Sequence, residues 1–301
     1  MVQPKFEERY EQMIPRIKDN FIRPSGTGET WKFDIDPLPK NFDNYFIESC
    51  NAAEEIYDLK EGKLHVMYSG GVDSEYALSV FLHMGMDVTP VIVRLQPNYN
   101  DHDTVYAFQF CKTKNITPII IDIDFKNFLE SGKYDDTNKI IKSNAWGRAA
   151  TCYAMGLIDG SIICGEGDPH ISKDETTGIW YFDDVEHAYN MDTYMKHKSM
   201  DGTTFFNGYT SKMVAAFLTD PRMRDLADNK IKGKLGSHSS KYMIYSRHSG
   251  FDLEKRPKFH GFEKIIESDL AKHPDFVKLL DPQLEHGGFR IKYYDIIKDL
   301  I

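Results

Sequence analysis

The residue types and spacing best suited to chemistry occur in one segment, SGGVDS at residues 69–74. Its glycines let the backbone turn sharply and approach a ligand closely. A helix predicted directly after the segment would offer free N–H groups and the positive end of its dipole. The hydroxyls of Ser69 and Ser74 add donors, so the segment can cradle a polyphosphate or pyrophosphate. Asp73 would repel a bare phosphate, which indicates that it holds a divalent cation bridging the phosphates.

Other interpretations of this segment explain less of it. The chain contains no GxxxxGK[ST] pattern, and no GxGxxG pattern follows a predicted strand. An ordinary strand-to-helix turn capped by Ser or Asp is the structural alternative. A cap needs fewer fixed residues than SGGVDS supplies, so we favour phosphate binding.

The elements that must position this segment are predicted from hydrophobic periodicity. Buried strands are predicted by short apolar or β-branched runs at 64–68, 88–95, 118–123 and 161–164. Helices are predicted between them over 75–84, 104–114 and 138–157. This alternation indicates an α/β fold with a mainly parallel, doubly wound sheet. Such sheets bind ligands beyond the carboxyl ends of their strands, where both SGGVDS and the sequence GEGD of 165–168 are expected.

Three regions are predicted along the chain. Residues 1–60 form an N-terminal extension that ends in a helix, residues 61–170 form the α/β domain, and residues 171–301 form a mostly helical substrate-side region packed on the same site. Strand signals fade after about residue 171. Helices are expected there over 183–198, 211–228, 261–272 and 293–300.

The SGGVDS segment resembles the pyrophosphate loop of the ATP pyrophosphatase superfamily. That superfamily includes asparagine, GMP and NAD synthetases, argininosuccinate synthetases and several tRNA-modifying enzymes. The resemblance implies a fold like that of adenine nucleotide alpha hydrolases and cleavage of ATP to AMP and pyrophosphate, usually by adenylation of a substrate oxygen. It also implies that ATP and its pyrophosphate are bound by Ser69, Gly70, Gly71, Asp73 and Ser74.

The GEGD sequence of residues 165–168 is similar to the GEGxDE segment of asparagine synthetase and β-lactam synthetase domains. In those domains the Glu and the following Asp lie near the reaction centre, and the Asp helps to hold magnesium. The resemblance implies that Glu166 is a catalytic base or an orienting group and that Asp73 and Asp168 hold Mg²⁺. This chain departs from the pattern, because one residue is missing before Asp168 and Pro169 replaces the second acid. An exposed acidic loop after a strand is the alternative.

Two further regions resemble the same synthetases. The helix that begins at Arg148 is similar to the helix before GEG, which places Arg148 and Gly165 at the ATP site. The segments 240–242 and 255–263 look like the C-terminal RxKxxF region, in which a lysine stabilises negative charge as the acyl-adenylate forms and collapses. Lys258 occupies that position. A core helix with an exposed Arg and a solvated basic loop are the respective alternatives.

Composition narrows the classes of function. The chain has 37 basic and 46 acidic residues, a formal charge of −9, which argues against a general nucleic-acid binder. Its four cysteines form no CxxC pair and are expected to be reduced structural thiols. No apolar run approaches a membrane span and no signal core is visible, so a cytoplasmic protein is expected. Val2 stands where a glutaminase domain would have its cysteine, so the nucleophile would be free ammonia, an amine substrate, an internal group of the substrate, or ammonia from a partner protein.

These features together predict an AMP-forming ligase that makes a C–N bond using ATP and Mg²⁺. It would adenylate a small-molecule substrate, with a carboxylate favoured, for attack by an amine or ammonia. Two alternatives stay open. The same chemistry could act on a nucleobase carbonyl in nucleotide or tRNA modification, or the chain could be a non-catalytic module that binds ATP or AMP.

Overall fold

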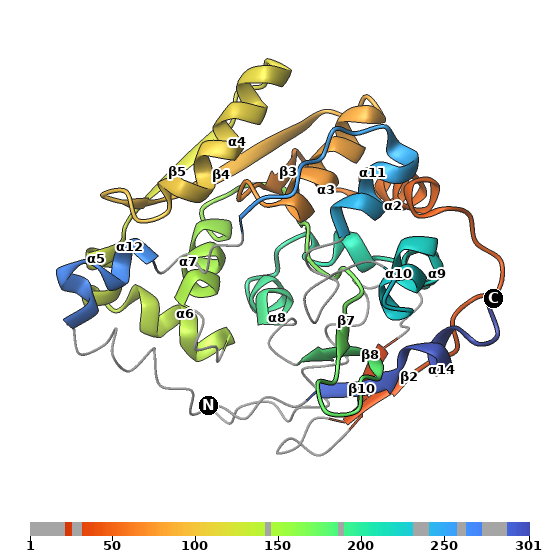
Figure 1. Ribbon diagram of the computed structural model, residues 1–301. Coiled ribbons are helices and arrows are strands. Elements are labelled where there is room, and N and C mark those ends of the chain that lie inside the picture. The colour runs from red at the N-terminus through yellow and green to blue at the C-terminus, as the bar shows by residue number, and fades with distance from the viewer. Residues whose placement is uncertain are drawn as a thin grey trace.

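A parallel sheet of five strands forms the centre of the protein (Figure 1). The computed structural model describes residues 22–25, 32–141, 146–185, 190–230, 241–257, 263–272 and 288–301. The strand order is β5-β4-β3-β6-β9, and each neighbouring pair is parallel. The strands are β3 (Leu64–Met67), β4 (Val88–Gln96), β5 (Ile119–Asp124), β6 (Ser161–Cys164) and β9 (Gly202–Thr203).

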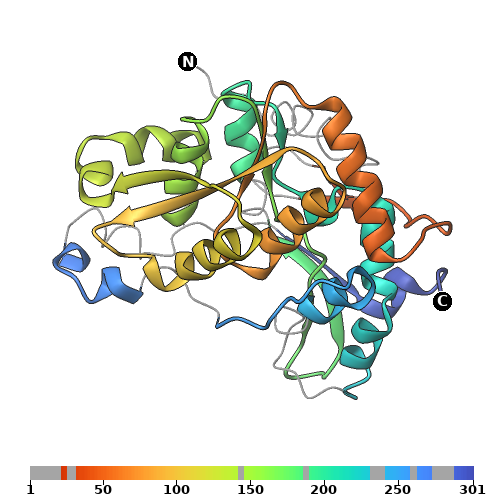
Figure 2. The same ribbon diagram turned by 90° about the horizontal axis from the view of Figure 1, so that it is seen from above.

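Helices cover both faces of this sheet, and alternate strand residues point to opposite faces. Val66 and Ile163 pack in the cluster that includes helices α2, α3 and α9, whereas Met67 and Ile162 pack in the cluster of α5, α6, α7 and α8. Figure 2 shows β4 and β5 between α3 and α4 on one side and α6 and α7 on the other. The helices are α2 (Tyr45–Leu59), α3 (Val72–His83), α4 (Asp101–Lys114), α5 (Phe125–Glu130), α6 (Lys133–Ile141), α7 (Trp146–Met155), α8 (Asn190–His197) and α9 (Ser211–Thr219).

The topology reverses beside β3. The chain first builds β4 and β5 on one side of β3, and then returns to place β6 and β9 on the other side. Leu64 of β3 is paired with Val88 of β4 and with Ser161 of β6. Ligands of open α/β sheets bind at such a reversal, outside the carboxyl ends of the strands. The segments that follow β3 and β6 both leave the sheet at this point.

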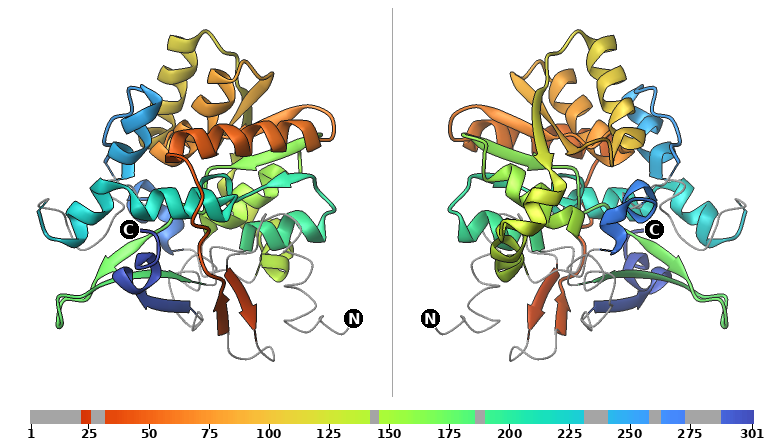
Figure 3. Two further views of the ribbon diagram at one scale, coloured as in Figure 1. Left: turned by 90° about the vertical axis from the view of Figure 1, so that its right-hand side faces the viewer. Right: turned by 90° about the vertical axis from the view of Figure 1, so that its left-hand side faces the viewer.

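The rest of the chain adds helices and a second sheet. That sheet has the antiparallel order β10-β8-β7, and β2 lies beside β10 at the end of the molecule opposite α4 (Figures 1 and 3). Its strands are β7 (Ile171–Lys173), β8 (Trp180–Val185) and β10 (Gly288–Lys292), and the separate pair is β1 (Ile22–Ser25) and β2 (Lys32–Ile35). The remaining helices are α10 (Pro221–Ala227), α11 (Lys241–Ser249), α12 (Glu263–Ile266) and α14 (Tyr293–Ile297), with short 3₁₀ turns at Phe206–Gly208 and Asp269–Lys272.

The predicted α/β class and parallel sheet are confirmed, and the C-terminal half does contain helices. One local expectation was wrong: the helix predicted over 183–198 is divided between strand β8 and helix α8. The alternation of buried Trp180 and Phe182 with the half-exposed Tyr181 is a strand pattern, and pairing with β7 and β10 stabilises it. The short β9 also joins the main sheet from the C-terminal half. In the described part of the chain, no helix combines the length and apolarity required to cross a membrane.

Candidate functional site

The segment after β3 forms a tight turn that opens helix α3. Gly70 has a φ of 92°, a conformation that favours glycine. A Cβ there would lie 2.5 Å from the carbonyl oxygen of Asp103, so α4 packs directly on the turn. Helix α3 begins after Gly71 without a side-chain cap. The Oγ of Ser69 accepts from the N–H of Gly71 at 3.2 Å and lies 3.2 Å from the Oγ of Ser74. The turn therefore presents an uncapped helix N-terminus framed by hydroxyls.

Asp73 and Asp168 converge on one cation. Asp73 lies in the first turn of α3, and Asp168 follows β6. The Nζ of Lys241, at the start of α11, lies 2.5 Å from the Oδ2 of Asp73 and 3.1 Å from the Oδ2 of Asp168. Tyr245, one turn later on α11, donates its hydroxyl to the Oδ1 of Asp73 at 2.8 Å. Both acids predicted as metal ligands therefore share a single positive charge.

Burial controls the charges in this cluster. The Lys241 and Asp168 side chains are 8% and 14% exposed, and the Asp73 side chain is 29% exposed. Burial, reinforced by Asp168 and opposed by Lys241, raises the pKa of Asp73 to about 6. Burial lowers the pKa of Lys241, but the charges of Asp168 and Asp73 outweigh it and raise the pKa above its usual value. The ammonium thus stays charged and offsets the repulsion between the carboxylates.

The two loops that carry these acids are held in direct contact. A Cβ on Gly165 would lie 2.6 Å from the carbonyl oxygen of Asp73, so only a glycine fits there without a shift. The fully buried Asn207 donates its Nδ2 to the carbonyl of Gly165 at 2.7 Å, and its own N–H donates to the carbonyl of Glu166 at 2.9 Å. Sequence reasoning missed Asn207, because a single Asn between two aromatic-rich segments has no distinctive pattern.

Glu166 and Arg148 form an ion pair, with the Nη1 of Arg148 3.0 Å from the Oε2 of Glu166. Their side chains are 32% and 23% exposed, so the pair lies at the surface of the site. Because the guanidinium holds one carboxylate oxygen, Glu166 has a fixed direction. A carboxylate held in one direction is suited to orienting a substrate group.

Stacked tyrosines support the Asp73 side of the site. The rings of Tyr76 and Tyr245 stack with centroids 4.3 Å apart, and Tyr45 stacks on both at 5.5 and 5.7 Å. The hydroxyl of Tyr76 donates to the Oγ of Ser49, and that of Tyr45 donates to the carbonyl of Asn207. Buried aromatic stacks with satisfied hydroxyls are rigid, so they fix the position of α11 relative to α3.

Arg256 ties the C-terminal segment to the turn. Its Nη1 donates to the carbonyl of Gly70, its Nη2 lies 2.5 Å from the Oε2 of Glu75, and its guanidinium lies 4.8 Å from the ring centroid of Tyr106. Tyr68 also donates to Glu75, at 2.5 Å. The predicted lysine of this segment, Lys258, lies outside the described residues. Two residues earlier in the chain, Arg256 does reach the site. The sequence analysis included Arg256 in the segment 255–263 but gave it no role of its own.

The residues present fit a magnesium ion. Within the described ranges no group of three or more His, Cys, Asp or Glu side chains could hold a metal, so the protein itself would supply two carboxylates. Mg²⁺ is commonly held by one or two carboxylates together with substrate phosphates. Asp73 and Asp168 already share the ammonium of Lys241 beside the turn at residues 69–74, so both carboxylates point to one cation position.

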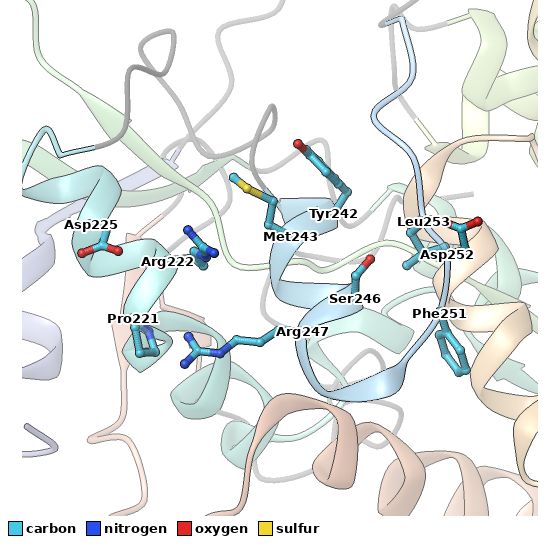
Figure 4. Close-up of a pocket in the computed structure, with 10 residues that line it drawn as sticks. All are labelled: Pro221, Arg222, Asp225, Tyr242, Met243, Ser246, Arg247, Phe251, Asp252 and Leu253. Atoms are coloured by element: carbon cyan, nitrogen blue, oxygen red, sulfur yellow. The ribbon is translucent and has the colours of Figure 1, made fainter.

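A cavity of about 670 Å³ runs along another side of α11, between α10 and residues 251–253 (Figure 4). Arg222 and Arg247 both line it, and the side chain of Arg247 extends from α11 towards α10 (Figure 4). Arg247 also pairs with Asp220 at 3.1 Å. The lining residues of α11 fall on the face opposite Lys241, so the helix separates this cavity from the two carboxylates.

The structure thus brings together nearly all of the predicted site residues. Ser69, Gly70, Gly71, Asp73, Ser74, Arg148, Gly165, Glu166 and Asp168 lie on the loops and helix ends at the carboxyl edge of the sheet. The four cysteines are free thiols, and burial raises the pKa of Cys111 to about 11. A raised pKa disfavours the nucleophilic thiolate, in agreement with a structural role.

Comparison with solved structures finds distant likenesses. NH3-dependent NAD synthetase from Campylobacter jejuni subsp. jejuni, in complex with nitrate, matches at 17% identity with a TM-score of 0.33, covering 41% of this chain and 56% of that one. A predicted subunit of tRNA methyltransferase from Methanocaldococcus jannaschii matches at 15% identity with a TM-score of 0.33, covering 66% of this chain and 94% of that one. The chain thus spans little more than half of the NAD synthetase. TM-scores this low assign no function.

No protein-family model matches the chain, and no curated protein sequence matches it either.

Proposed function

We propose that the protein is an ATP pyrophosphatase-type enzyme that binds Mg-ATP at the turn after β3 and cleaves it between the α and β phosphates. The observation that carries this proposal is the convergence of Asp73 and Asp168 on one cation position. The two acids come from the loops after the adjacent strands β3 and β6, at the point where the sheet topology reverses. A phosphate-binding turn and a cation site side by side are what a metal–nucleotide complex requires.

The turn and helix α3 would bind the β and γ phosphates. The first N–H groups of α3 would donate to phosphate oxygens, as would the hydroxyls of Ser69 and Ser74, with the Ser74 hydroxyl giving up its bond to the carbonyl of Gly71. Asp73 and Asp168 would hold Mg²⁺, which when bound neutralises phosphate charge. In this arrangement the α phosphate would lie on the side of the loop after β6, which carries Glu166 and its partner Arg148.

The reaction that fits this geometry is adenylation followed by amide formation. An oxygen of a substrate carboxylate attacks the α phosphorus, the bond from that phosphorus to the bridging oxygen breaks, and pyrophosphate leaves. An amine or ammonia then attacks the acyl carbon, AMP leaves with the electrons of the C–O bond, and the nitrogen loses a proton. We assign Glu166, held by Arg148, to orient the nucleophile and to accept its proton.

The test is product analysis with ATP labelled at the α phosphate. The protein is incubated with Mg-ATP and a panel of carboxylic acids with ammonia or amines, and in parallel with nucleobases and nucleosides. We expect AMP and pyrophosphate in equal amounts with at least one carboxylic acid. ADP and phosphate without AMP would contradict the proposal, whereas AMP formed only with a nucleobase would move the reaction to base modification.

Matched carboxylate variants give the control. Asp73→Asn should abolish AMP formation, because it removes the acid nearest the phosphate-binding turn. Asp136→Asn removes an acid whose side chain is 78% exposed on α6, and it should leave AMP formation unchanged. Equal activity of the two variants would show that the Asp73 carboxylate has no part in the reaction.

A further inference from the structure

Lys241 occupies the place of the cation that the two carboxylates would hold. Its ammonium contacts one oxygen of Asp73 and one of Asp168, at 2.5 and 3.1 Å. A magnesium ion bound to the same oxygens would sit about 2.1 Å from each of them. The ammonium and the metal would then overlap in space, and their charges would repel each other. Lys241 must leave before a metal ion can bridge Asp73 and Asp168.

We propose that Lys241 is an internal counter-ion that excludes free Mg²⁺ from the Asp73–Asp168 pair and gives way only when the metal arrives with a nucleotide. This inference rests on the metal–nucleotide site of the proposed function and adds an order of binding to it. Free Mg²⁺ would have to displace a buried ammonium that already offsets part of the charge of the two acids. A nucleotide brings several negative charges, so the displaced ammonium gains new partners.

The neighbouring groups are arranged for such an exchange. Tyr245 holds the Oδ1 of Asp73 independently of Lys241, so that carboxylate keeps its direction when the ammonium moves. Lys241 is the first residue of α11, while Tyr245 and the stacked Tyr76 anchor the next turn of the helix. The flexible side chain can therefore swing from the carboxylates towards phosphate oxygens at the turn without movement of the helix.

The test measures Mn²⁺ binding to the full chain without nucleotide, by the electron paramagnetic resonance signal of free Mn²⁺. Metal can bind only in the fraction of molecules in which Lys241 has left Asp73 and Asp168. The apparent metal affinity is reduced by that fraction. We expect Lys241→Met to bind one Mn²⁺ at least about tenfold more tightly than the natural chain. Adding Asp168→Asn to Lys241→Met should remove this binding. Equal Mn²⁺ affinities of the natural chain and Lys241→Met would overturn the proposal.

The chain contains a matched control for this experiment. Lys230 also contacts two acids, Asp225 at 3.7 Å and Asp228 at 2.8 Å, but its side chain is 64% exposed. Lys230→Met should leave Mn²⁺ binding unchanged. If Lys241→Met does not fold, Lys241→Gln retains a donor to one carboxylate while removing the charge, and it should show the same gain in affinity.

The Mn²⁺-binding test and the AMP-formation test can fail independently, because Mn²⁺ binding requires no turnover. AMP formation by the natural chain with no gain of Mn²⁺ binding in either Lys241 variant would refute the counter-ion role alone. A gain of binding in a chain that never forms AMP would refute the proposed reaction alone.

Discussion

At the scale of single residues, the site is built from charges and donors that are satisfied together. Asp73 accepts from both Lys241 and Tyr245 in the buried part of the site, and Glu166 accepts from Arg148 at its surface. Removing one member of a buried charged group leaves the others without compensation, which costs about 3–5 kcal/mol for a buried pair. Substitutions that retain shape therefore separate a functional role from a loss of folding better than truncation to alanine does.

Tyr245→Phe is such a substitution. It keeps the stacked ring and removes only the hydroxyl that donates to Asp73. A hydrogen bond to a charged group contributes about 1.5–3 kcal/mol. We therefore expect kcat/KM for pyrophosphate release to fall about tenfold or more, with Asp73 less well oriented. The measurement is the initial rate of pyrophosphate release at varied ATP.

Tyr134→Phe is the matched control. The hydroxyl of Tyr134 is buried and has no hydrogen-bond partner within the described residues. Its removal should leave kcat/KM unchanged and keep or slightly raise the melting temperature. An unchanged kcat/KM in Tyr245→Phe, at native stability, would mean that the hydroxyl does not orient Asp73 for the reaction.

At the scale of elements, the site depends on close contact between the loops that follow β3 and β6. Parallel pairing of Met67 with Cys164 brings the ends of these strands side by side. Gly165 then touches the backbone of Asp73, and Asn207 links both to the segment after β9. Three loops at one sheet edge therefore act as one unit, so a change in one of them should displace the others.

Gly165→Ala tests this contact. The added Cβ would lie 2.6 Å from the carbonyl oxygen of Asp73, which is backbone and cannot rotate away. Overpacking of this kind costs about 1–3 kcal/mol. We expect a lower melting temperature and weaker Mg-ATP binding by isothermal titration calorimetry, because the loops of Asp73 and Asp168 must separate.

Gly147→Ala provides the comparison in the nearby helix α7. A Cβ at Gly147 meets no atom within 4 Å, and alanine favours a helix by up to about 1 kcal/mol over glycine. This variant should be as stable as the natural chain or more stable, with unchanged Mg-ATP affinity. Native-like Mg-ATP binding by Gly165→Ala would show that the loops need not touch.

At the scale of the whole molecule, the site is closed by residues far away in the sequence, and this limited what the sequence could predict. The turn at 69–74 and the strands around it were predictable, because glycine spacing and apolar runs are local signals. Lys241 reaches Asp73 across 168 positions, and Arg256 reaches Gly70 across 186. The sequence indicates the segments 240–242 and 255–263 but does not indicate which residues Lys241 and Arg256 contact. The last three residues of β8 were predicted as the start of a helix because the partners β7 and β10, which stabilise the strand, are separate segments of the chain.

The long-range contact of Arg256 gives the prediction that belongs to this scale. Arg256 joins the C-terminal segment to the turn through Gly70 and through Glu75, whose side chain is only 4% exposed. Arg256→Gln would remove the positive charge beside the buried Glu75 carboxylate. Of the two donors Arg256 and Tyr68, only the Tyr68 hydroxyl would remain. We expect a loss of about 3–5 kcal/mol in the free energy of unfolding, measured with urea, and weaker Mg-ATP binding.

Arg94→Gln is the matched change for comparison, because Arg94 forms a two-pronged contact with Asp122 at the surface, where their side chains are 36% and 46% exposed. Exposed pairs contribute at most about 1 kcal/mol, so this variant should unfold at nearly the same urea concentration as the natural chain. If both variants lost similar stability, the Arg256 contact would be no more than a surface ion pair. If Arg256→Gln lost stability but bound Mg-ATP normally, the C-terminal segment would support the fold without shaping the turn.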